Sequence, residues 1–87
     1  VKVWDTLAIA AYLDEIRPKA GLLPKEAKAR AHCRAICGEM HSGFAAVRRD
    51  LSMNIRRRMG CAPDWPDDTR RQLARLDALW SGLRAQH

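Results

Sequence analysis

Apolar residues recur at helical spacing in three segments of the chain, and the first segment is clearly bounded at both ends. We expect its helix to cover about 5–17, because Asp5 or Thr6 can cap the N-terminus and the residue before Pro18 avoids helical geometry. Four apolar residues follow the i, i+3, i+4, i+7 rule and share one face: Ile9, Tyr12, Leu13 and Ile16.

The second segment has the longest pattern and predicts one helix over about 26–51. Gly38 and Gly43 interrupt its interior, where each costs about 1 kcal/mol relative to alanine. Close approach by another backbone or a ligand, or a local bend, would explain them. The apolar stripe consists of Cys33, Ile36, Cys37, Met40, Phe44, Val47 and Leu51. Basic side chains form one row along a flank of this stripe: Arg30, Arg34, His41 and Arg48.

Two irregular stretches separate the helices. Residues 18–25 contain two prolines and a glycine, which break regular structure, and a leucine pair at 22–23 that can pack into a groove. Residues 52–65 form a loop with an arginine triplet at 56–58, and a third helix follows over about 67–85. The apolar stripe of this helix consists of Leu73, Leu76, Trp80 and Leu83.

The pattern as a whole predicts an all-α fold for these 87 residues. Residues 1–4 alternate like the end of a strand, Val1 stands where an initiator methionine would, and the chain stops directly after a helical pattern. We therefore expect a fragment of a larger soluble protein. In isolation its helices should expose apolar faces that other elements would cover.

The chain is strongly basic, with a formal net charge of +6. Such a balance suits nucleic acid, an anionic small ligand or an acidic partner. Nucleic-acid binding has only the charge in its favour, because the sequence has one Phe and one Tyr, and its helices lack the short turn of a helix-turn-helix motif. We expect no nucleic-acid partner.

The cysteines bear on compartment and on metal binding. Cys33 and Cys37 lie one helical turn apart and Cys61 lies in a loop, a poor disulfide framework that fits a reducing cytoplasm. Cys37 and His41 would make half of a zinc site, but two further ligands at zinc spacing are missing. No apolar run approaches the length of a membrane span and no signal peptide opens the chain. We expect a cytoplasmic protein without a metal or a membrane partner.

No complete active site is visible in the sequence. There is no nucleophile and base pair, no Gly-rich phosphate loop and no pair of carboxylates on one face. The start of the first helix, at Asp5 and Thr6, is the one candidate binding motif, because unpaired N–H groups and the positive end of the helix dipole favour a carboxylate there. Taken alone, this motif is most often only an N-cap.

Two stretches give the motif a context. Residues 3–13, VWDTLAIAAYL, resemble the last strand-to-helix turn of the thioredoxin-like domain in cytosolic glutathione transferases. The stretch that follows, with its Leu-Leu-Pro at 22–24, is similar to the linker between the two domains of these enzymes. Residues 39–44, EMHSGF, resemble the first long helix of the all-α domain in bacterial members. The resemblance covers essentially the whole chain, with the elements in the order of the family.

The resemblance implies a usually dimeric, two-domain enzyme that adds the glutathione thiolate to electrophilic small molecules. Residues 1–17 would end the thioredoxin-like glutathione-binding domain, 18–25 would join the domains and 26–87 would begin the all-α domain. Glutathione would be the co-substrate. The thiol-activating residue of the family would precede Val1, so we expect no catalytic residue within this chain.

The resemblance also implies which residues form the site. Asp5 would hold the amino group of glutathione and Thr6 its γ-glutamyl carboxylate, although Asp-Thr departs from the commoner Glu-Ser pair. His41 would lie beside the thiol and donate a hydrogen bond to the thiolate. Three further residues would line or border the electrophile pocket: Met40, Phe44 and Arg48. The two apolar members of this set are also typical of core or dimer-contact positions.

Two other classes of protein stay open. A non-catalytic homologue, or a small helical interaction module, would keep the fold without activating a thiol. A basic bundle that binds nucleic acid ranks third.

Overall fold

The computed structural model describes residues 1–56, 58 and 63–86, and the described part is mostly helical without a strand. The all-α expectation is confirmed, while the assignment to transferase domains stays a prediction. The chain divides into two compact units, Val1–Gly43 and Phe44–His87, and each is described by itself. Arg57 and Cys61, which belong to the predicted loop, and the terminal His87 lie outside the described residues.

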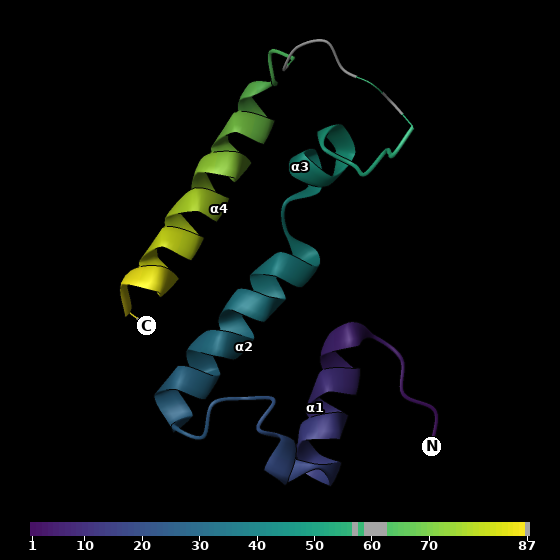
Figure 1. The fold of residues 1–87 in the computed structure, drawn as a ribbon, viewed down its shortest axis with the longest axis vertical. Coiled ribbons are helices and arrows are strands. Elements are labelled where there is room, and N and C mark those ends of the chain that lie inside the picture. The colour runs from purple at the N-terminus through teal and green to yellow at the C-terminus, as the bar shows by residue number, and fades with distance from the viewer. Residues whose placement is uncertain (57, 59–62, 87) are drawn as a thin grey trace. The chain divides into compact units, whose positions relative to one another are not determined.

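The first unit holds two helices that lie side by side, α1 (Thr6–Ile16) and α2 (Ala27–Ser42), joined through the short 3-10 helix η1 (Pro18–Ala20) (Figure 1). Local chemistry sets their bounds. Pro18 occupies the first turn of η1, and Gly21 ends it in the left-handed conformation with φ 61°. The carboxylate of Glu26 caps α2 by accepting from the N–H groups of Lys28 at 2.9 Å and Ala29 at 2.6 Å.

The predicted single helix over 26–51 is wrong, because the structure divides it into α2 and α3 (Ala45–Asp50). Gly43 ends α2 by donating its N–H to the carbonyl oxygen of Glu39 at 2.8 Å. A Cβ at position 43 would stand 2.5 Å from that same oxygen, so only glycine fits this turn. Phe44 then takes the left-handed conformation, with φ 61°. Gly38 has no close approach, since a Cβ there would meet nothing within 4 Å.

The break also corrects the predicted row of basic residues. Arg30, Arg34 and His41 lie on α2, in the first unit, whereas Arg48 lies on α3, in the second. A continuous helical flank therefore does not connect Arg48 with the other three.

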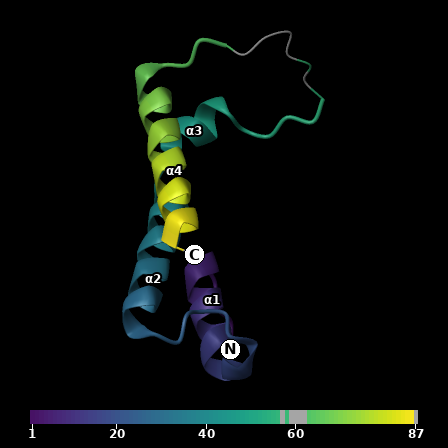
Figure 2. The same cartoon turned by 60° about the vertical axis from the view of Figure 1, so that its left-hand side comes forward.

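The second unit consists of α3 packed against α4 (Asp67–Gln86) (Figure 2). The buried residues among those described all belong to it: Phe44, Ala46 and Thr69. The Thr69 hydroxyl donates a hydrogen bond to the Asp50 carboxylate at the end of α3. The N–H of Val47 donates to the Oε1 of Gln72 at 3.1 Å. These two hydrogen bonds therefore orient α3 and α4 relative to each other.

We expect Thr69→Val to lower the free energy of unfolding by about 1 kcal/mol, because valine keeps the shape of threonine and removes one hydrogen bond. The side chain of Asp50 also accepts from Arg49, at 2.7 Å, so its carboxylate stays partnered in the variant. Urea unfolding followed by circular dichroism measures the change. In an Asp50→Ala background the same substitution should cost almost nothing. An equal cost in both backgrounds would mean that the bond does not stabilise the unit.

The predicted apolar face of α1 is largely uncovered. Its four residues are each about two-fifths exposed: Ile9 40%, Tyr12 37%, Leu13 41% and Ile16 41%. The side of α1 that faces α2 instead carries Leu7, Ala10 and Ala11, which are half-buried. The expectation of an exposed apolar face is thereby confirmed for this helix.

Candidate functional site

The start of α1 and the last turn of α2 meet through one polar contact. Nε2 of His41 donates to Oδ2 of Asp5 at 2.9 Å, and the two side chains are 42% and 45% exposed. Both groups are therefore held together and still open to solvent. The structure thus joins two of the residues that the sequence singled out.

The sequence left Asp5 and Thr6 as candidate N-caps of α1, and in the structure the N-cap is Asp5. Its Oδ1 accepts hydrogen bonds from the N–H of Leu7 at 2.8 Å and of Ala8 at 3.3 Å. These two bonds, and then the nearby His41, hold the pKa of the Asp5 carboxyl below its usual range. Its backbone has φ 75° and ψ 130°, outside the regions that a residue other than glycine normally occupies. Backbone strain of this kind is found most often at functional sites.

Thr6 is the first residue of α1 and is exposed. The cap uses neither its N–H nor its hydroxyl, because Asp5 accepts from Leu7 and Ala8 instead. Both donors of Thr6 thus lie at the positive end of the helix dipole, beside a carboxylate. A ligand that carries an ammonium and a carboxylate on one carbon would find an acceptor and a donor set there.

The other predicted site residues are divided between the two units. Met40 is half-buried on α2, in the same unit as Asp5. Phe44 and Arg48 belong to the second unit, where Phe44 is only 7% exposed and Arg48 is exposed on α3. Phe44 is as buried as a core residue. A core position was the alternative to an electrophile-pocket position that the sequence pattern allowed.

The thiols of Cys33 and Cys37 are free. Burial, and then the neighbouring Cys37, raise the pKa of the Cys33 thiol, so Cys33 is a poor nucleophile. In the part of the chain that the structure describes, no three His, Cys, Asp or Glu side chains gather into a metal-binding group. Among the described helices, none has both the length and the apolar character of a membrane span.

Sequence reasoning missed the contact between Asp5 and His41, and also a cavity bordered by Leu7, Arg34 and Cys37. The contact depends on how α1 packs against α2, and no local pattern encodes that. The sequence held some evidence for Cys37 as a lining residue, because it belongs to the predicted apolar stripe of α2. For Arg34 the only evidence was its position in the predicted row of basic residues.

Two helix caps give the chain a defined pH dependence. The pKa values of Asp5 and Glu26 are both lowered, chiefly by hydrogen bonds from backbone N–H groups. Each carboxylate therefore stabilises the fold at pH values above its unfolded-state pKa, and this contribution is lost as pH falls through the folded-state pKa. We expect the urea midpoint to be flat from about pH 7 to 5 and to fall below about pH 4. Glu26→Gln should reduce that fall. If the urea midpoint of Glu26→Gln has the same pH dependence as that of the parent, the Glu26 carboxylate does not contribute to the fall.

No protein-family model, curated protein or solved structure matches this chain.

Proposed function

We propose that this chain is the central part of a bacterial-type glutathione transferase, in which the start of α1 binds the γ-glutamyl end of glutathione. The observation that carries the proposal is the Asp5–His41 contact, with Nε2 and Oδ2 2.9 Å apart. It lies where a strained N-cap residue and an unused donor pair on Thr6 coincide. Together these three features support a ligand-binding site at this end of the helix.

The chemistry of the ligand matches the groups at this end of the helix. The γ-glutamyl carboxylate would accept from the N–H and hydroxyl of Thr6, and the helix dipole adds to this attraction. The ammonium would face the Asp5 carboxylate. A carboxylate has about four acceptor positions, so the bonds from Leu7, Ala8 and His41 leave room for one more donor.

His41 takes a role that differs from the one the resemblance implies. Its Nε2 donates to Asp5, so we assign it to orienting that carboxylate rather than to a bond with the thiolate. In the reaction, the glutathione thiolate would attack an electrophilic carbon and form a carbon–sulfur bond, while a leaving group departs with its bonding electrons or the electron pair of an activated double bond moves onto the substrate. The protein would favour the thiolate through hydrogen bonds and positive potential. Glutathione is the co-substrate, and a homodimer is the expected assembly.

The proposal predicts that Thr6→Ala weakens glutathione binding by about tenfold, because one hydrogen bond to a charged group is lost. Asp5 forms the cap, so this variant should unfold at nearly the same temperature as the parent. Calorimetric titration of the full-length enzyme with glutathione measures the affinity. Ser81→Ala removes an exposed hydroxyl from α4 and is the matched control. Unchanged affinity in Thr6→Ala would refute the proposed site.

The alternatives make different predictions in the same titration. A small helical interaction module without the glutathione site would give no heat with glutathione, whereas a non-catalytic homologue that keeps the site would bind glutathione without conjugating it to an electrophile. A nucleic-acid-binding bundle would form a sequence-selective complex that survives physiological salt, whereas charge alone gives a weak complex that salt dissociates.

A further inference from the structure

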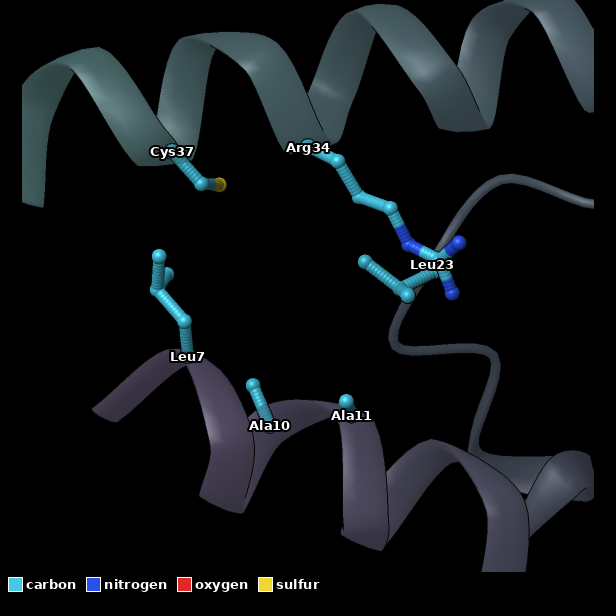
Figure 3. Close-up of a pocket in the computed structure, with 6 residues that line it drawn as sticks. All are labelled: Leu7, Ala10, Ala11, Leu23, Arg34 and Cys37. Atoms are coloured by element: carbon cyan, nitrogen blue, oxygen red, sulfur yellow. The ribbon is translucent and has the colours of Figure 1, made fainter. Parts of the chain in front are cut away.

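Unit 1 contains an apolar cavity of about 290 Å³ between α1, the segment 18–25 and α2. Six side chains line it (Figure 3): Leu7, Ala10, Ala11, Leu23, Arg34 and Cys37. Aliphatic groups form most of the wall, and the guanidinium of Arg34 is the one charged group in this set. Small-molecule sites are typically of this kind, with apolar walls and a few polar groups that orient the ligand.

A second hollow of about 350 Å³ adjoins the first, because Leu23 and Arg34 line both. It is more polar, and Lys25 and Arg30 add two cations to Arg34, whereas Asp14 is the one acid in its lining. Positive charge therefore exceeds negative charge at the end of the cavity that Arg34 borders. An anionic group would be attracted to this end.

The two arginines of this region differ in what they bind. Nη1 of Arg30 donates to the carbonyl oxygens of Pro24 at 3.1 Å and Lys25 at 2.7 Å, so Arg30 holds the segment that enters α2. Arg34 is exposed, and its guanidinium lies beside Leu23 without a hydrogen bond or ion pair to another described residue. The fork of donors on Arg34 is therefore available to a carboxylate.

We propose that unit 1 binds a small amphipathic anion, with its apolar body in the cavity and its carboxylate or sulfonate on Arg34. The cavity volume corresponds to a ligand of about ten non-hydrogen atoms, taking about 30 Å³ for each. The site includes neither Asp5, Thr6 nor His41, so it goes beyond the glutathione proposal and does not depend on it.

Octanoate and octanamide form a matched pair of probes, because they have the same shape and only octanoate is charged. In calorimetric titrations of the full chain we expect octanoate to bind about fivefold more tightly, as one exposed charge pair allows. Arg34→Gln should abolish this preference and leave octanamide binding unchanged. Arg71→Gln, which removes an exposed cation from α4, should leave the preference intact. Equal affinity for the two probes, or a preference that survives Arg34→Gln, would overturn the proposal.

Cys37 reports occupancy of the cavity by a separate route. Its thiol is exposed and lines the cavity, so bound octanoate should slow its alkylation by iodoacetamide several-fold. Fragment-ion mass spectrometry reads Cys37 separately from Cys33. A second variant, Ala11→Phe, places a ring in the cavity and should abolish both binding and protection. Octanoate binding without protection of Cys37 would place the ligand elsewhere, for example on the uncovered face of α1, and would refute the site.

Discussion

Gly43→Ala should lower the free energy of unfolding by about 1–3 kcal/mol, the range expected when a substitution forces backbone to move. A Cβ at this position would stand 2.5 Å from the carbonyl oxygen of Glu39. That oxygen also accepts the N–H of Gly43 at 2.8 Å. The clash therefore involves backbone on both sides, and no side-chain rotation can relieve it. Urea unfolding monitored by circular dichroism measures the loss.

Gly38→Ala is the matched control, because it adds the same methyl group to the same helix. A Cβ at Gly38 would meet nothing within 4 Å, so alanine should stabilise α2 by about 0.5–1 kcal/mol through its higher helix propensity. The two substitutions should thus have opposite signs. If both stabilise the chain, the helix does not turn at Gly43 as described.

Asp5→Asn should weaken glutathione binding by about 10–150-fold, as expected for losing a charged partner of an ammonium. Asparagine keeps an oxygen in the place of Oδ1, which caps α1 through Leu7 and Ala8. The melting temperature should therefore fall only slightly. Titration calorimetry and a thermal melt of the same sample separate the two effects.

Asp5→Ala completes the comparison, since it removes the cap as well as the charge. We expect it to lose both affinity and stability. His41→Gln should weaken binding less than Asp5→Asn, because His41 acts through the carboxylate that it orients. If both Asp5 variants bind glutathione like the parent and differ only in stability, Asp5 is a helix cap without a ligand.

The bounds of α1 follow from local rules, and they were predictable for that reason. A capping acid at Asp5 and a proline at position 18 act within one turn of the helix. The face of α1 that meets α2 was harder to predict, because apolar residues lie on several sides of this helix. The stripe of Ile9, Tyr12, Leu13 and Ile16 has the right period but is largely exposed.

The break after α2 shows what periodicity cannot detect. The apolar stripe continues through Phe44, so the pattern alone favours one helix. The turn depends instead on a contact between one missing Cβ and one carbonyl oxygen, and on the left-handed conformation of Phe44. The candidate site was likewise predictable in part: Asp5 and Thr6 follow from a motif, whereas the partner of Asp5 depends on tertiary packing.

The uneven distribution of burial between the two units has a consequence for the order of folding. Phe44, Ala46 and Thr69 are buried in the second unit, whereas no described residue of the first unit is buried. Segments with few buried apolar contacts open and exchange most readily. The first unit leaves the ribosome before the second, yet α3 and α4 hold the contacts that consolidate a domain. We therefore expect the second unit to become stably folded although it is synthesised later, while α1 keeps its apolar face open to chaperones.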